Sequence, residues 1–203
     1  LQDLKRKVRM ATILGTFQST LTNFKYLRKI WTQNTEEERL LGVSLTGIMD
    51  HPVLSKTTDS TRWLKEMKDE AVLTNQEYAK LLGIPQSAAI TCVKPSGTVS
   101  QLTNSASGIH ARHSPYYIRT VRADNNDPLT KLMKDEGVVN EPDVMKPEYT
   151  TVFSFPTRSP VDAVVRSEVS AIEQLELWKI YAEKWCEHKP SITVTVKEDE
   201  WMD

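Results

Sequence analysis

The chain has 203 residues, of which 26 are Lys or Arg and 27 are Asp or Glu, so its formal net charge is -1 at pH 7. This balance gives no overall field that would recruit nucleic acid or an anionic membrane, so any anion binding must be local. The apolar stretches are far shorter than the roughly 20 residues of a membrane span, and no signal peptide opens the chain. With two cysteines and no disulfide framework, we expect a cytoplasmic protein.

Helical and strand patterns alternate along the chain. Apolar spacing and capping signals predict helices over residues 4–27, from Asp59 or Ser60 to about residue 72, over 76–82, from Asp127 to about 136, and over 170–188. Apolar or alternating segments predict strands over residues 40–48, 88–93, 116–122, 150–155 and 191–196. Residues 32–39 are predicted to form a polar turn, with Thr35 as a candidate cap for residues 36–39.

This alternation favours an α/β layer or barrel. The chain opens inside a predicted helix and stops soon after a predicted strand. We therefore expect residues 1–203 to be a single partial domain, truncated at both ends.

The most informative segment is a Pro-Ser-Gly-Thr turn between a predicted buried strand and a predicted helix. Helix-opening amides lack internal acceptors, the helix dipole adds about half a positive charge, and Gly97 permits close approach by phosphate oxygens. Hydroxyl donors can come from Ser96, Thr98 and Ser100, and a full charge from Lys94. An ordinary turn in which Ser96 or Thr98 only caps the helix explains the pattern equally well, and the P-loop spacing is absent.

A second cluster, at residues 108–119, gathers two histidines, two arginines and two tyrosines. Such a set can bind anions or stack on a ring, but a surface loop whose arginines pair with carboxylates is the favoured interpretation from composition alone. No Cys or carboxylate lies near His110 and His113 to complete a metal set, so no metal site is expected. Cys92 is expected to be a packed, inert thiol, whereas Cys186, among basic residues, is a candidate for modest activation.

Three stretches, taken in order, resemble the large catalytic chain of ribonucleotide reductases. They are residues 38–50 (ERLLGVSLTGIMD), residues 94–98 (KPSGT) and residues 108–119 (GIHARHSPYYIR). With the closing region at 178–196, the resemblance spans nearly the whole chain, and the third stretch is most similar to the adenosylcobalamin-dependent, class II branch.

The resemblance implies the C-terminal portion of a ten-stranded α/β barrel. In that family the turn that matches residues 95–100 holds the ribonucleotide phosphates through main-chain amides and hydroxyls. The resemblance therefore implies the candidate phosphate-binding residues Pro95, Ser96, Gly97, Thr98, Val99 and Ser100. A thiyl radical on a cysteine then attacks the ribose, with radical generation delegated to adenosylcobalamin. The implied enzyme is a ribonucleoside-triphosphate reductase that converts ribonucleotides to deoxyribonucleotides. Its partners would be a ribonucleotide substrate and a thioredoxin-like reductant, with no nucleic acid and no membrane.

The chain also departs from the family. The Asn-Pro-Cys motif with a nearby Glu and the redox cysteines have no match, and neither Cys92 nor Cys186 stands at those positions. We therefore assign no catalytic residue and expect this chain alone to be inactive. Two other classes stay open: a non-catalytic phosphate- or nucleotide-binding α/β module, and a structural α/β domain whose turn is only a cap. Within the family, a class I chain that takes its radical from a partner subunit stays open as well.

Overall fold

A computed structural model describes residues 1–201 of the chain. Its contacts divide the chain into two compact units. Unit 1 is built from Leu1–Arg112 and the described part of Asp162–Asp203, and unit 2 is His113–Val161. None of the helices described is both long and apolar enough to cross a membrane. The single partial domain expected from the sequence stays a prediction.

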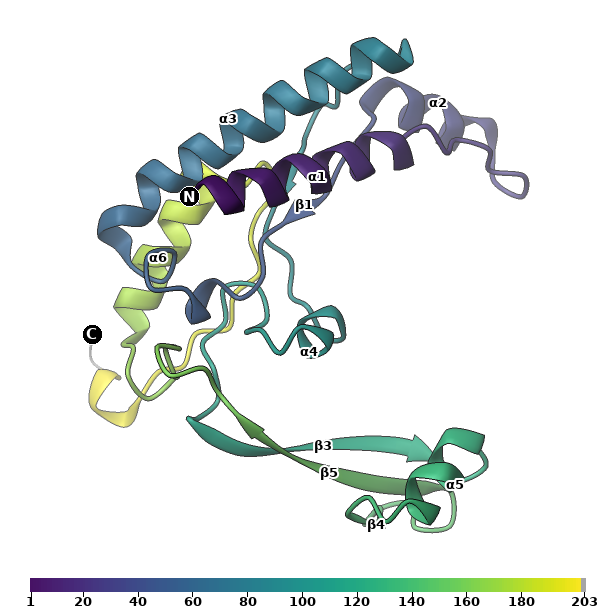
Figure 1. The fold of residues 1–203 in the computed structure, drawn as a ribbon, viewed down its shortest axis with the longest axis vertical. Helices are drawn as coiled ribbons and strands as arrows, with labels where there is room; N and C mark the ends of the chain where they lie inside the picture. Colours follow the sequence, from purple (N-terminus) through teal and green to yellow (C-terminus); the bar gives the residue numbers. More distant parts are fainter. Residues whose placement is uncertain (202–203) are drawn as a thin grey trace. The chain divides into compact units, whose positions relative to one another are not determined.

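Unit 1 is mainly helical. Its longer helices are α1 (Gln2–Gln18), α2 (Lys29–Glu38), α3 (Thr57–Leu82) and α6 (Ala171–Lys184). Helix α3 packs against both α1 and α6 (Figure 1). Its buried positions recur every three or four residues, as in Leu64, Met67 and Ala71, which gives the helix one continuous apolar face. The helix ends at Gly83, whose φ of 67° is the left-handed conformation common at helix ends.

A short parallel pair of strands, β1 (Val43–Ser44) and β2 (Thr91–Cys92), lies in unit 1. They fall within the predicted strands at residues 40–48 and 88–93, but each is only two residues long. A 3-10 turn, η1 (Ile48–Asp50), follows β1, and the four-residue helix α4 (Val99–Leu102) follows β2. A further 3-10 turn, η2 (Glu198–Glu200), lies near the end of the described chain.

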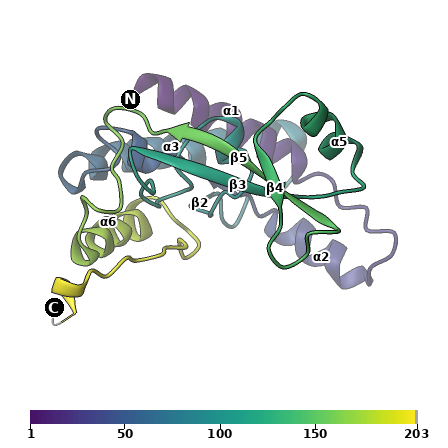
Figure 2. The ribbon, with the colours of Figure 1, turned by 90° about the horizontal axis from the view of Figure 1, so that it is seen from below.

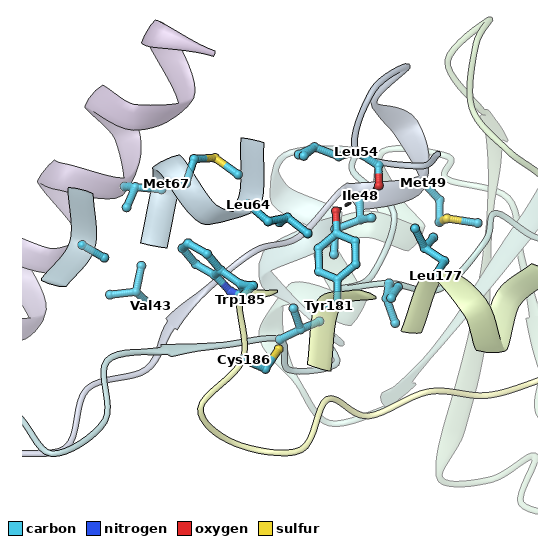
Figure 3. Close-up of a cluster of buried hydrophobic side chains, with 14 of the residues drawn as sticks. Val43, Ile48, Met49, Leu54, Leu64, Met67, Leu177, Tyr181, Trp185 and Cys186 are labelled. Carbon is cyan, nitrogen blue, oxygen red and sulfur yellow. Dashed lines mark hydrogen bonds between the residues drawn. The ribbon is translucent and has the colours of Figure 1, made fainter. Parts of the chain in front are cut away.

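The core of unit 1 lies between α3, α6 and the strand pair (Figure 3). Trp185 and Tyr181 are its largest side chains, and both are fully buried. Their polar atoms are satisfied, because Tyr181 Oη donates to Leu54 O (2.9 Å) and Trp185 Nε1 donates to Cys92 O (2.7 Å). The end of α6 is thereby fixed to strand β2.

Unit 2 is an antiparallel sheet with one helix (Figure 2). Its elements are β3 (Tyr116–Asp124), α5 (Pro128–Asp135), β4 (Asn140–Pro142) and β5 (Thr150–Arg158). The strand order is β3-β5-β4. Helix α5 begins as predicted, because the Asp127 side chain accepts from Leu129 N and Pro128 takes the first helical position. The strands predicted at residues 116–122 and 150–155 are confirmed, and both extend further than predicted.

Two predictions in the N-terminal region were wrong. The helix expected over residues 4–27 ends at Gln18, where Ser19 and Thr20 donate their hydroxyls to main-chain carbonyls of the preceding turn. The polar turn expected at residues 32–39 is mostly helix α2, in which Thr35 is an interior residue and not a cap. The Glu and Gln side chains of this helix favour helix despite their polarity.

The two separate helices expected at residues 60–72 and 76–82 are one helix, α3. Thr74 and Asn75, which favour turns, lie inside it because tertiary contacts compensate. Thr74 Oγ1 accepts from Arg9 Nη1 of α1 (3.3 Å), and Asn75 Nδ2 donates to Thr16 Oγ1 and Ser87 Oγ (3.0 Å each).

The strand predicted at residues 191–196 is absent from the part of the chain that the structure describes. This segment lies along α6 instead. Trp178 Nε1 donates to Pro190 O (2.9 Å) and Gln174 Nε2 donates to Thr193 O (3.0 Å), so side chains replace a strand ladder. The whole is a mixed α/β structure in which the two-stranded sheet is parallel and the three-stranded sheet is antiparallel.

Candidate functional site

The turn singled out in the sequence carries the chain from the core of unit 1 to its surface. Val93 is fully buried, whereas Lys94, Pro95 and residues 97–99 are exposed. The main-chain N–H groups of residues 97, 98 and 99 donate to no acceptor within residues 1–201. Three consecutive exposed amides without an internal acceptor are suited to bind an oxyanion.

Two serines brace this turn from inside. Ser96 Oγ accepts from Ser100 N (2.8 Å), and the buried Ser100 hydroxyl donates to Ser96 O (2.5 Å). The Ser96 hydroxyl keeps its own proton, so it remains able to donate to a ligand. The exposed Thr98 side chain makes no capping hydrogen bond. Ser96 therefore acts as a cap for one amide, that of Ser100, as the capping alternative expected. This cap does not use the main-chain amides of residues 97–99.

Helix α4 is shorter than the sequence suggested. It has four residues, so its dipole contributes far less than the half charge expected of a long helix. The electrostatic case for an anion therefore depends on the individual amides. Lys94 adds a full charge nearby, although its Nζ lies 2.7 Å from His188 Nδ1 and is therefore already in contact with a protein group.

The chain that returns from the turn packs beneath it. Ser107 Oγ accepts from Ser96 N (2.8 Å). Gly108 has a φ of 53°, and a Cβ added there would lie 2.8 Å from Lys94 O. A glycine is required at this position both by its left-handed backbone and by its contact with the base of the turn.

The stretch at residues 43–50 supports the same returning segment. Thr46 Oγ1 accepts from Gly108 N and donates to Ala106 O (3.0 Å each). Asp50 Oδ2 accepts from Ala106 N (2.6 Å), and both Asp50 oxygens pair with Arg112 (2.8 Å each). Parts of all three stretches that carried the resemblance therefore meet in unit 1.

The structure settles some of the alternatives for the second cluster. Arg112 pairs with a carboxylate, as the favoured interpretation expected, but it is only 5% exposed and does not lie on the surface, whereas Tyr116 is 69% exposed and not packed in a core. Within unit 2, Tyr117 has an edge contact with His113, and Arg158 lies over the Tyr116 ring at 5.8 Å. The pairing of Asp50 with Arg112 was missed, because both residues were visible in the motifs but 62 positions separate them.

Neither cysteine has the environment of a reactive thiol. Burial raises the pKa of the Cys92 thiol, and burial raises the pKa of Cys186 to about 12. The predicted modest activation of Cys186 was therefore wrong, because removal of the thiol from water outweighs its basic neighbours. Among the described residues, no group of three or more His, Cys, Asp or Glu side chains could hold a metal ion.

Comparisons with known proteins agree on one group of relatives. No protein-family model matches the chain. The adenosylcobalamin-dependent ribonucleoside-triphosphate reductase of Euglena gracilis is 28% identical over 96% of this chain, and that of Lactobacillus gasseri is 29% identical over 98%. The enzyme with this name from Levilactobacillus brevis is 34% identical over 65% of this chain.

A solved structure gives the same answer for the fold. The crystal structure of a B12-dependent, class II ribonucleotide reductase matches 95% of this chain with a TM-score of 0.80, at 24% sequence identity. The chain covers 26% of the Euglena protein, 30% of the L. gasseri protein and 31% of the crystallised chain. It therefore spans less than a third of the length of these relatives.

Proposed function

Because the chain is homologous to class II, adenosylcobalamin-dependent ribonucleotide reductases, we propose that it is the part of such an enzyme that holds the phosphates of the substrate. In this proposal it forms the C-terminal portion of the ten-stranded α/β barrel. The substrate is a ribonucleoside triphosphate, the product a deoxyribonucleotide, and the electron donor a thioredoxin-like protein.

The observation that carries the proposal is the row of free amides at residues 97–99, on a turn braced by Ser96 and Ser100. Fixed N–H dipoles stabilise phosphate oxygens without a reorganisation cost on binding. The Thr98 hydroxyl is exposed beside these amides and can donate as well. Phosphate held in this way would position the ribose for chemistry done elsewhere in the protein.

This chain contributes positioning and no redox chemistry in the proposal. Cys92 and Cys186 are both buried, and the pKa of each thiol is raised by burial. A thiol that is hard to ionise is a poor relay for electrons. The 203-residue chain is therefore expected to reduce no nucleotide by itself.

The described residues do not fit adenosylcobalamin on their own. Pockets on their surface have volumes of about 350, 390, 460 and 510 Å³, which suit a small ligand and not a corrin ring with its nucleotide tail. Cobalamin dependence in this proposal is a property of a longer protein, and no step is assigned to it here.

The test is binding of a ribonucleoside triphosphate to the 203-residue chain, followed by NMR of the main-chain amides. We expect the signals of residues 97–99 to shift on binding, and Thr98→Val to weaken the affinity by roughly tenfold through loss of one hydrogen bond to a charged group. Thr58→Val is a matched control, because Thr58 is also exposed on unit 1. Binding that leaves the signals of residues 97–99 unchanged would contradict the proposed site.

A longer protein that contains this chain provides the second test. We expect it to reduce nucleotides only when adenosylcobalamin is present, with the Ser96→Ala/Thr98→Ala double variant impaired mainly in KM. Phosphate binding without reduction under any radical source would favour the non-catalytic nucleotide-binding module.

A further inference from the structure

We propose that the ion pair between Asp50 and Arg112 is a positioning element of the phosphate-binding turn and is not itself a phosphate ligand. The inference rests on the proposed function of the turn. It names two residues that act on the turn through the returning segment, defined here as residues 104–108.

The Arg112 guanidinium is directed into the protein. Its side chain is 5% exposed, and Nε and Nη2 donate to the two oxygens of Asp50 at 2.8 Å each. Nη2 also donates to Asn104 O (2.6 Å), and Nη1 to Asn104 Oδ1 (3.3 Å). An arginine that binds a phosphate must present its N–H groups to the ligand, whereas these are directed to protein acceptors.

The pair fixes the start and the middle of the returning segment. Arg112 binds Asn104, whose φ of 46° is unusual for a residue other than glycine. Asp50 Oδ2 accepts from Ala106 N (2.6 Å), and Gly47 N donates to Ala106 O (2.7 Å). The segment is thereby held in one conformation on residues 46–50.

The returning segment in turn holds the phosphate-binding turn at two points. Ser105 N donates to Ser100 O (2.8 Å), and Ser107 Oγ accepts from Ser96 N (2.8 Å). The four residues involved lie outside the free amides at 97–99. Loss of the ion pair would therefore loosen the turn without removing any of the proposed phosphate donors. Phosphate affinity would fall because binding would then have to order the turn first.

Two variants test this without leaving an unpaired charge in a partly buried site. Arg112→Lys keeps the charge but loses the bidentate geometry. The double variant Asp50→Asn/Arg112→Gln removes both charges together. Arg9→Lys is the matched control, because Arg9 Nη2 pairs with Glu77 at 2.8 Å elsewhere in unit 1.

Two measurements are made on the 203-residue chain. Binding of inorganic triphosphate is expected to weaken about tenfold in Arg112→Lys and to remain unchanged in the control. Amide hydrogen exchange without ligand is expected to speed up at Ser96 and Ala106. Exchange at Leu64 and Ala71, in the core helix α3, is expected to stay as in the unaltered chain, which separates local loosening from general destabilisation.

The outcomes separate this inference from the function on which it rests. If the unaltered chain does not bind triphosphate, the proposed function and this inference fail together. If the unaltered chain binds triphosphate, and Arg112→Lys and Asp50→Asn/Arg112→Gln both bind it as tightly as the Arg9→Lys control, only the positioning role is overturned. Faster exchange spread evenly over α3 would also overturn it, because the pair would then stabilise the fold as a whole.

Discussion

Gly108 shows how one residue can decide the shape of the candidate site. Its φ of 53° disfavours any side chain, and a Cβ would lie 2.8 Å from the Lys94 carbonyl oxygen. The oxygen belongs to the main chain at the base of the turn, so it cannot move aside cheaply. The left-handed backbone of Gly108 and its contact with Lys94 O therefore both disfavour a side chain at this position.

Gly108→Ala is expected to destabilise the chain by about 2–4 kcal/mol, from the combined left-handed strain and backbone clash. Gly137→Ala is the control, because Gly137 has a φ of 75° but nothing within 4 Å of an added Cβ. It should cost only about 1 kcal/mol. Urea unfolding measures both variants, and equal losses would show that the contact with Lys94 O is unimportant.

At the residue scale, local effects could be predicted from the sequence, whereas contacts between distant residues could not. Asp127 and Pro128 start α5 as predicted, because their effect depends only on neighbouring residues. The partnership of Asp50 with Arg112 could not be predicted, because it depends on a fold that brings distant segments together. The local pattern indicated an anion-binding turn, and the family resemblance gave the six candidate residues 95–100, whose binding role stays a prediction.

At the scale of elements, His51 connects helix α3 to the segment that precedes it through hydrogen bonds and a ring contact. His51 Nδ1 accepts hydrogen bonds from Val53 N (3.1 Å) and Leu54 N (3.2 Å). Its ring also has an edge contact with Trp63 of α3. The ring must stay neutral to accept at Nδ1, and burial lowers its pKa below the ordinary 6.5.

This arrangement predicts a pH dependence of stability. A histidine whose pKa is lowered by folding contributes its full stabilisation above pH 6.5, and the stabilisation falls as the pH drops below that value, where the unfolded chain takes up the proton first. His51→Asn keeps an acceptor that does not titrate. The difference in urea midpoint between about pH 7.5 and about pH 5.5 should therefore be smaller in His51→Asn than in the unaltered chain. An unchanged difference would contradict the role of His51.

Element types were predicted better than element boundaries. Segments with a strong period, such as those of α5, α6 and β5, were recognised correctly. The predicted break in α3 was wrong because Thr74 and Asn75 find partners in α1, Arg9 and Thr16, that local rules do not consider. The predicted last strand was wrong because alternation describes an extended chain and does not require a neighbouring strand.

At the scale of the whole molecule, the division into two units has a direct test. The chain leaves unit 1 after Arg112 and returns at Asp162. Arg112 N donates to Val164 O (3.0 Å) and Arg166 N donates to Arg112 O (2.8 Å), so the two ends are tied within unit 1 itself. The core of unit 1 contains no residue of unit 2.

Replacing residues 113–161 by a short Gly-Ser linker is therefore expected to leave unit 1 folded. Its cooperative thermal unfolding and its helical circular dichroism should be retained, because every member of its core cluster remains. The same linker in place of residues 171–184 is the control, and should abolish folding because it removes Leu177 and Tyr181 from the core. Loss of cooperative unfolding in the first variant would show that unit 1 depends on unit 2.

The overall fold class followed from the alternation of helices and strands, but the sheets did not. Alternation predicted an α/β layer or barrel but not the directions of the strands: β1 and β2 are parallel, whereas β3 and β4 each pair antiparallel with β5. Helix α5, which lies between β3 and β4 in the sequence, is only eight residues long. Motifs spaced far apart in sequence gave the relationship to the reductases, which periodicity alone could not have given.

In the proposed role, the three free amides at residues 97–99 would also make the turn undiscriminating. A main-chain N–H group reads charge and size but no chemical identity, so sulfate, inorganic phosphate and a nucleotide tail all compete for the same donors. Selectivity for a nucleotide must then arise from contacts to its sugar and base. On this proposal, nucleotide affinity measured in phosphate or sulfate buffer would understate the strength of the turn. Titration of the buffer anion itself would then measure how much free energy the amides provide.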